Sequence, residues 1–129
     1  MKRLIIFLIA FFLVACQAQP SLGPYTNVGP AELNSMLASK DFVFVNVHIP
    51  FEGDIDGTDL SIPYDQITEP DNLALLPANK GAQIVLYCRS GRMSEIAANA
   101  LVGLGYTNVW NLDGGMIEWE RQGFEIVGR

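Results

Sequence analysis

Four short segments of the chain are rich in apolar residues with few polar interruptions. The continuous runs over 42–47 and 84–87 are typical of strands buried on both sides in a parallel sheet. Pro63 ends the second segment as a strand, because proline lacks the backbone donor that a sheet requires. The predicted strands cover 42–47, 60–64, 84–87 and 108–112.

Apolar residues at helical spacing lie between and around these strands. Pro30 suits the first turn of a helix over 31–39, a more regular helix ends at Gly105, and a last helix covers 116–121. Strands that alternate with helices predict an α/β domain with a mainly parallel sheet and helices on both faces. The residues expected to face the core are Leu33, Met36 and Leu37 in the first helix, and Met93, Ile96, Ala97, Ala100, Leu101 and Leu104 in the second.

The N-terminal segment has a different pattern. Lys2 and Arg3 precede the eleven residues of 4–14, none of which is charged or polar. A helix that crosses a bilayer needs about 20 apolar residues, so this run is too short to span one. A basic start followed by a short apolar run is typical of a secretory signal peptide, which predicts that residues 1–15 direct export.

The end of the apolar run, Leu13-Val14-Ala15-Cys16, resembles the lipobox of bacterial lipoproteins. This resemblance implies cleavage before Cys16, lipidation of its sulfur and a chain anchored in the bacterial cell envelope, facing the periplasm. Gln17 stands where Asp would favour retention in the inner membrane, so the outer membrane is the expected destination. The alternative is cleavage after Ala18, which would give a soluble periplasmic protein. We expect residues 16–28 to form a lipidated tether and 29–129 a single domain.

Composition and charge narrow the class of protein. The chain has 129 residues, half of them hydrophobic, and a formal net charge of −6. Removing residues 1–15 removes two cations and no acid, which leaves the mature chain at −8. This charge argues against nucleic acid as a partner and against binding to anionic lipid headgroups. Two cysteines and one histidine are poor material for a disulfide scaffold or a structural zinc site, and we expect no metal or cofactor.

Cys88 lies between a predicted buried strand and a predicted helix, where ligands of parallel sheets bind. Gly91 permits a tight curl whose backbone N–H groups, with the helix N-terminus, would form an anion cradle beside the sulfur. Arg89 and Arg92 add positive charge, which favours thiolate over thiol. Two alternatives remain open: Cys88 as a small buried hydrophobe, and Arg92 as a solvated surface charge. Ser90 and Ser94 would hydrogen-bond the loop or cap the helix.

The segment Tyr87-Cys88-Arg89-Ser90-Gly91-Arg92-Met93-Ser94 resembles the active-site loop of rhodanese-like sulfurtransferases. The match continues through 104–109 and 112–116 to Trp119. The resemblance implies a five-stranded parallel sheet, with Cys88 as the catalytic residue that accepts sulfane sulfur as a persulfide. It also implies a loop of six residues, 88–93, whereas related phosphatases and arsenate reductases use one more. The substrate-binding residues it implies are Arg89, Ser90, Gly91, Arg92, Met93 and Ser94.

The chain departs from the family pattern at three places. Asn46-Val47-His48 stands where an Asp-x-Arg pair is frequent, an acidic stretch occupies 53–59, and Met93 replaces the usual Arg or Thr. These departures weaken the case for thiosulfate as the natural donor. His48 is either a proton donor near the opening of the active site or an ordinary loop histidine, and the second interpretation is favoured. We expect Asp54, Asp56 and Asp59 to lie in a solvated loop rather than in a calcium site. Trp110 and Trp119 are expected in the core or in a pocket wall. Gly114 and Gly115 are expected to form a turn.

The sequence therefore predicts an exported sulfurtransferase. It would move sulfane sulfur from a donor such as thiosulfate to a thiophilic acceptor through a Cys88 persulfide. Its partners would be a small sulfur compound or an acceptor thiol, and we expect a monomer that contacts the membrane through its lipid alone. The alternative is a catalytically weak rhodanese-like module that binds a partner or presents a thiol. A dithiol oxidoreductase is disfavoured, because no resolving cysteine lies near Cys88.

Overall fold

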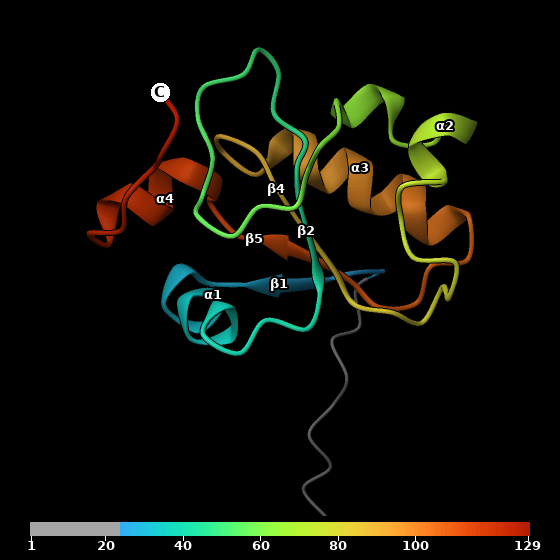
Figure 1. Cartoon of the computed structure of the whole chain (residues 1–129), viewed down its shortest axis with the longest axis horizontal. Coiled ribbons are helices and arrows are strands. Elements are labelled where there is room, and N and C mark those ends of the chain that lie inside the picture. The colour runs from blue at the N-terminus through green and yellow to red at the C-terminus, as the bar shows by residue number, and fades with distance from the viewer. Residues whose placement is uncertain (1–23) are drawn as a thin grey trace, which may run out of the picture.

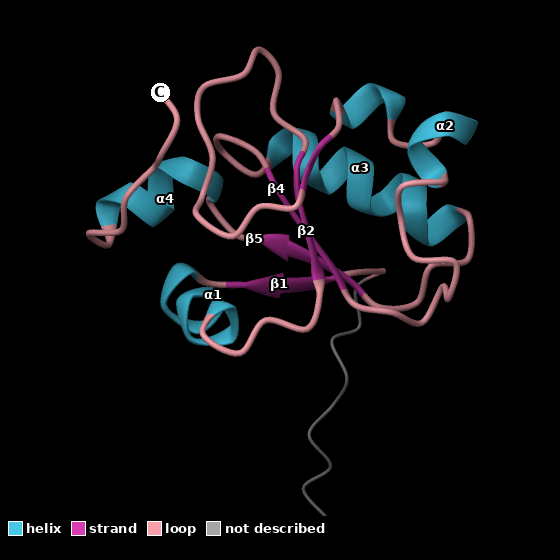
Figure 2. Cartoon of the chain, viewed as in Figure 1, coloured by secondary structure: helices cyan, strands magenta, loops and turns pink. Residues whose placement is uncertain are grey.

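A five-stranded sheet forms the centre of the molecule (Figure 2). The computed structural model describes residues 24–129. Every strand pairs in parallel with its neighbours, in the order β1-β5-β4-β2-β3. This arrangement confirms the predicted α/β fold with a parallel sheet. The strands are β1 (Thr26–Val28), β2 (Val43–Asn46), β3 (Leu60–Ser61), β4 (Ile84–Tyr87) and β5 (Val109–Leu112).

Helices cover both faces of this sheet. Figure 1 shows α1 and α4 on one side and α2 and α3 on the other. Two hydrophobic clusters separate the helices from the sheet: Leu101 belongs to the first, under α3, and Leu33 and Trp119 belong to the second, under α1 and α4. β4 is buried along its whole length, because it lies at the centre of the sheet between both layers. The helices are α1 (Pro30–Leu37), α2 (Pro70–Leu73), α3 (Arg92–Gly103) and α4 (Gly115–Arg121), with a 3₁₀ turn η1 (Tyr64–Gln66).

Three elements were not anticipated from the sequence. β1 comprises the last residues of the segment 16–28 that was expected to be a tether, and it pairs with β5 at the edge of the sheet. Its three residues are too few to show a period of two. The turn η1 and the single-turn helix α2 are likewise too short for a periodic pattern. No helix within 24–129 is long and apolar enough to cross a bilayer, and the predicted signal peptide and Cys16 lie outside the described residues.

The predicted apolar stripe of α3 was wrong at two positions. Ile96 is 45% exposed and Leu104 is 40% exposed, whereas Ser94 is fully buried. The small side chains of Ala97 and Ala98 allow the helix to pack closely on the sheet with this face inward. The rotation of α3 follows from its start, because the preceding loop directs Ser94 toward the sulfur of Cys88.

Hydrogen bonds fix the long loop between β2 and β3 onto the sheet. The amide nitrogen of Asn46 donates to the carbonyl of Gly53 and to Oδ1 of Asp54, both at 2.9 Å, while its oxygen accepts the N–H of His48 at 3.0 Å. The hydroxyl of Tyr87 accepts the N–H of Ile55 at 3.0 Å and lies 3.2 Å from Oδ1 of Asp54. The loop is therefore anchored beside the carboxyl ends of β2 and β4.

The acidic residues of this loop are not equally solvated. Asp56 is exposed, as expected for a surface loop. Asp59 instead accepts the N–H of Phe44 at 2.8 Å and forms an ion pair with Lys40 at 2.7 Å. Asp54 accepts the bond from Asn46 described above. Two of the three carboxylates thus form hydrogen bonds that stabilise the loop, while Asp56 and Asp59 are exposed as expected.

Candidate functional site

Cys88 follows directly after β4, at the carboxyl end of the central strand. The chain then curls through Gly91, which has a φ of +101°, and enters α3 at Arg92. A side chain would strain this left-handed conformation, so glycine makes the curl possible. The curl brings the N–H of Gly91 to 3.0 Å from Sγ of Cys88, to which it donates a hydrogen bond.

Ser94 completes the surroundings of the sulfur. Its hydroxyl oxygen lies 3.4 Å from Sγ of Cys88 and donates to the carbonyl of Gly91 at 3.0 Å. A hydroxyl has a single proton, so it donates either to this carbonyl or to the sulfur at any moment. The thiol can donate its own proton to the Ser94 oxygen, and a thiolate can accept the hydroxyl proton instead. Ser94 can therefore contact the sulfur in both protonation states.

The N-terminus of α3 adds further donors. The first backbone bond of the helix runs from the N–H of Glu95 to the carbonyl of Gly91 at 3.0 Å. The N–H groups of Arg92, Met93 and Ser94 precede it and have no carbonyl four residues earlier within the helix. The positive end of the helix dipole therefore lies at the cysteine loop, where it favours negative charge.

α4 supports the cysteine loop through its backbone. The N–H of Met116 donates to the carbonyl of Cys88 at 2.9 Å, and the N–H of Ile117 donates to that of Arg89 at 3.0 Å. Gly114 and Gly115 have φ values of +76° and +58°, which confirms the turn expected there. Because these bonds use the N–H groups at the start of α4, two helix N-termini meet at one loop.

The other predicted substrate-binding residues lie around the rim. Arg89, Ser90 and Arg92 are exposed, and Met93 is half-buried against the core on the α3 side. Nη1 of Arg89 lies 3.7 Å from a carboxylate oxygen of Glu52. The structure therefore brings Gly91 and Ser94 to the sulfur and leaves the arginines at the surface. Substrate binding by these residues stays a prediction.

His48 is connected to the same rim. It is 8% exposed, and its Nε2 lies 3.2 Å from the Glu52 oxygen that faces Arg89, although without the angles of a hydrogen bond. Glu52 thus lies between a buried imidazole and a guanidinium. His48 is therefore a buried histidine of the β2–β3 loop, and its role as a proton donor or as an ordinary loop residue stays a prediction.

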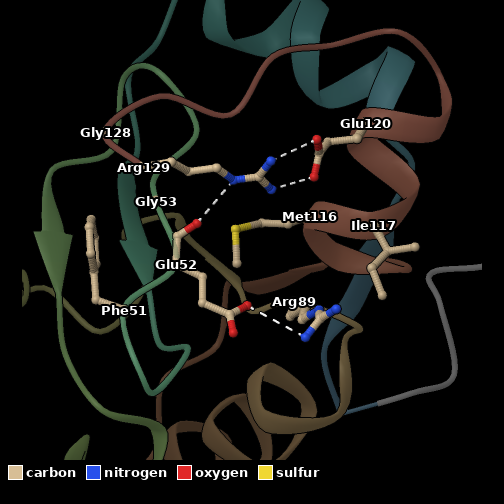
Figure 3. Close-up of a pocket in the computed structure, with 9 residues that line it drawn as sticks. All are labelled: Phe51, Glu52, Gly53, Arg89, Met116, Ile117, Glu120, Gly128 and Arg129. Atoms are coloured by element: carbon tan, nitrogen blue, oxygen red, sulfur yellow. Dashed lines mark hydrogen bonds and ion pairs between the residues drawn. The ribbon is translucent and has the colours of Figure 1, made fainter.

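A cavity of about 530 Å³ adjoins the cysteine loop (Figure 3). The thiol does not line it, and Cys88 is 1% exposed. The cavity reaches the loop through Arg89, the next residue along the chain. Its walls come from the β2–β3 loop, α4 and residues 128–129. The lining side chains are apolar at Phe51, Met116 and Ile117 and charged at Glu52, Arg89, Glu120 and Arg129.

The charges in this cavity are paired. Arg129 holds the carboxylate of Glu120 through two hydrogen bonds, which lower the pKa of Glu120. Its Nε also donates to the backbone carbonyl of Glu52 at 3.3 Å. The remaining cation and anion of the lining, Arg89 and Glu52, face each other as described above. The cavity therefore has apolar side chains and two ion pairs, in each of which a guanidinium and a carboxylate neutralise each other.

The sulfur of Cys88 is contacted by the N–H of Gly91 and by the hydroxyl of Ser94. Among residues 24–129, no group of three or more His, Cys, Asp or Glu side chains is arranged to hold a metal ion. Cys88 is the single cysteine of this part of the chain and forms no disulfide. The arrangement suits covalent chemistry at one sulfur.

The family model of the rhodanese-like domain matches residues 30–122. The chain belongs to the rhodanese-like domain family. This match covers all four α-helices and the cysteine loop, and it begins after β1. It confirms the resemblance seen in the sequence around Cys88.

The chain is also similar to individual proteins and to solved structures. The chain is 32% identical over 108 residues to the tRNA uridine(34) hydroxylase of Escherichia coli, which covers 78% of this chain and 31% of that protein. The chain thus spans about a third of these relatives' length. A rhodanese-like domain protein from Staphylococcus aureus is 31% identical with a TM-score of 0.63, over 80% of this chain and 99% of the other. A rhodanese-related protein from Thermoplasma volcanium shares the fold, with 24% identity and a TM-score of 0.66 over 80% and 98% of the two chains.

Several residues of the site were not found by reading the sequence. Glu52 and Arg129 belong to no sequence motif. Their positions depend on how the β2–β3 loop and residues 128–129 pack against α4. Phe51 is apolar but lies in a loop without periodicity. The pair Gly114-Gly115 was recognised as a turn, and the hydrogen bonds that α4 makes to the cysteine loop give this turn its part in the site.

Proposed function

We propose that the chain is a sulfurtransferase in which Cys88 carries sulfane sulfur as a persulfide. The observation that supports this most directly is the N–H of Gly91 donating to Sγ of Cys88 at 3.0 Å, at the N-terminus of α3. Hydrogen bonds from a preorganised backbone stabilise negative charge where it develops, both on a thiolate and on the outer sulfur of a persulfide. Membership of the rhodanese-like family is consistent with this chemistry.

The first step is attack by the Cys88 thiolate on the outer sulfur of the donor. A bond forms between Sγ and this sulfur, while the bond that held it in the donor breaks. The electron pair of the broken bond leaves with the first product, which is sulfite when the donor is thiosulfate. The N–H of Gly91 and the hydroxyl of Ser94 lie within reach of the sulfur throughout.

The second step returns the cysteine to its starting state. A thiophilic acceptor attacks the outer sulfur of the persulfide, and Cys88 leaves as a thiolate. The cycle causes no net oxidation or reduction of the protein and needs no cofactor. This two-step covalent pathway predicts ping-pong kinetics.

Mass spectrometry tests the first step. A full-length chain with Cys16→Ser leaves Cys88 as the sole thiol. After incubation with thiosulfate or an organic thiosulfonate, we expect a gain of one sulfur atom that is lost on adding cyanide. The matched Cys88→Ser variant should gain none. An unmodified Cys88 with every donor would contradict the proposal.

A catalytically weak module is the second candidate function. It is favoured by the burial of Cys88, which is 1% exposed, and by the carboxylate of Glu52 beside Arg89. Thiocyanate formation separates the two functions. Turnover with cyanide that disappears in Cys88→Ser supports the enzyme, and equal background rates for both chains support the binding module.

We further propose that the protein is exported and attached to the bacterial outer membrane by lipid on Cys16. The lipobox resemblance at 13–16 and the apolar run before it support this proposal. Metabolic labelling with radioactive palmitate should label the full-length chain, and the label should be absent from Cys16→Ser. A soluble, unlabelled periplasmic chain would favour cleavage after Ala18 instead.

A further inference from the structure

The cavity beside the cysteine loop has the size and lining of a site for an organic group. Its volume of about 530 Å³ lies in the range of pockets that hold small organic molecules. Phe51 is 55% exposed and Ile117 is 51% exposed, so both present apolar surface that a ligand could cover. Figure 3 shows the sulfur of Met116 directed into the space between them.

The charges of the cavity do not favour a small dianion. Thiosulfate carries two negative charges and would need cations without nearby carboxylates to replace its hydration. Each guanidinium in the lining instead faces a carboxylate: Arg89 faces Glu52 at 3.7 Å, and Arg129 is bound to Glu120. On the cysteine loop, Met93 is uncharged, and the exposed Arg92 does not line the cavity. A dianion would therefore meet about as much repulsion as attraction here.

The cavity is also connected to the nucleophile. Arg89 follows Cys88 in the chain, and the N–H of Met116 donates to the carbonyl of Cys88 at 2.9 Å. A donor whose organic group occupies the cavity would have its sulfur-bearing end beside Arg89, the residue that follows Cys88. An apolar body with a single charge near the sulfur matches both the lining and the N–H groups of the loop.

We propose, resting on the sulfurtransferase function above, that the donor is an organic sulfane-sulfur compound with a bulky apolar group, and that Phe51 and Ile117 bind this group. We assign Glu52 as a specificity-determining residue, because its carboxylate neutralises Arg89 and disfavours inorganic thiosulfate. With a thiosulfonate donor, the Cys88 thiolate attacks the terminal sulfur and a new S–S bond forms. The bond between this sulfur and the sulfonyl group breaks, and the sulfinate leaves with the electron pair.

Three donors separate the effects of size and charge. Benzenethiosulfonate and methanethiosulfonate are both monoanions but differ in their apolar group, and thiosulfate is a dianion. Values of kcat/KM for transfer to cyanide are measured with the full-length Cys16→Ser chain. Each is divided by the rate constant of the same donor with a free thiol, which removes intrinsic reactivity. We expect benzenethiosulfonate to give the highest ratio and thiosulfate the lowest.

Variants connect this order to the cavity. Phe51→Ala and Ile117→Ala should each lower kcat/KM for benzenethiosulfonate by about tenfold, the effect of losing one apolar contact surface, and leave methanethiosulfonate within about twofold. Leu75→Ala is the matched control, because Leu75 is 56% exposed and lies outside the cavity. Glu52→Gln should raise kcat/KM for thiosulfate by about threefold or more, since the guanidinium of Arg89 loses its counter-charge.

The outcomes distinguish this inference from the function on which it rests. Thiosulfate equal to or better than benzenethiosulfonate, with no effect of Phe51→Ala or Ile117→Ala, would overturn the inference and leave the sulfurtransferase intact. No sulfur transfer from any donor, with Cys88 unmodified by mass, would overturn the function and the inference together. A preference for the aromatic donor that Phe51→Ala removes and Leu75→Ala keeps would establish the cavity as the donor site.

Discussion

Gly115 lies so close to the carbonyl oxygen of Cys88 that a side chain there would overlap it. The ideal Cβ position would be 2.6 Å from the carbonyl oxygen of Arg89 and closer still to that of Cys88. This close approach lets the first N–H groups of α4 reach the two carbonyls of the cysteine loop. Gly115 therefore sets the position of the loop on which the nucleophile is carried.

Replacing Gly115 by alanine should destabilise the domain by about 3 kcal/mol or more, since it adds steric overlap to an unfavourable positive φ. Urea unfolding measures this change. Gly123→Ala isolates the cost of φ alone, because Gly123 has a φ of +92° and nothing within 4 Å of its ideal Cβ; about 1 kcal/mol is expected. Gly103→Ala, in a helix with open space around it, should be neutral or stabilising. Equal losses for Gly115→Ala and Gly123→Ala would show that the close approach is unimportant.

Local features of the cysteine site could be predicted from the sequence, because they depend on neighbouring residues. The continuous apolar run of β4 and the following Gly91 indicate a buried strand that ends in a tight curl, and both are present. The order of strands and helices likewise indicated the parallel sheet. A continuous apolar run indicates a buried strand, and a glycine indicates a tight curl. Both signals are contained in a short segment and need no knowledge of distant residues.

Contacts between distant segments could not be predicted in this way. Glu52 reaches Arg89 because Asn46 and Tyr87 fix the β2–β3 loop, and no periodicity indicates such bonds. The rotation of α3 was also missed at Ile96, because an apolar stripe does not show that a buried serine will face the nucleophile. Such features depend on which side chains satisfy buried polar groups in the folded chain.

Ser94→Ala should slow sulfur transfer by about tenfold, since hydrogen bonds to charged groups contribute about 1.5–3 kcal/mol and Ser94 is within reach of the Cys88 sulfur. Steady-state kcat with cyanide as acceptor measures the effect. Ser35→Ala is the control: its hydroxyl also bonds a backbone carbonyl of its own helix, but on α1, away from the cysteine loop. A full rate in Ser94→Ala would remove the hydroxyl from the mechanism.

Asn46→Asp should destabilise the domain more than Asn46→Ala does at pH 7. The amide of Asn46 donates to the carbonyl of Gly53 and to the carboxylate of Asp54, and a buried carboxylate at the same place would be repelled by both. We expect a loss of about 3 kcal/mol or more for Asp, because an uncompensated buried charge is costly. Thermal unfolding at pH 7 and pH 4 measures the difference, which should narrow in acid as the new carboxyl takes up a proton. Equal stability of the two variants at pH 7 would contradict the assigned hydrogen bonds.

Tyr87 should make the free energy of unfolding fall as the pH rises above 10. Burial raises the pKa of Tyr87 well above its ordinary value of 10.0, and the charge of Asp54 raises it further, while the hydrogen bonds with Thr58 and with the N–H of Ile55 lower it. The folded chain therefore keeps a proton that the unfolded chain releases above pH 10, so stability present below this pH is lost as the pH increases. Urea unfolding between pH 8 and pH 11 measures this slope, which Tyr87→Phe should reduce.

Absorbance of phenolate adds a second measurement. At pH 11, Tyr87→Phe should lower the phenolate absorbance of the chain unfolded in urea but leave that of the folded chain nearly unchanged. A matching decrease in the folded chain would show that the hydroxyl of Tyr87 ionises normally and does not anchor the β2–β3 loop as a neutral donor to Asp54.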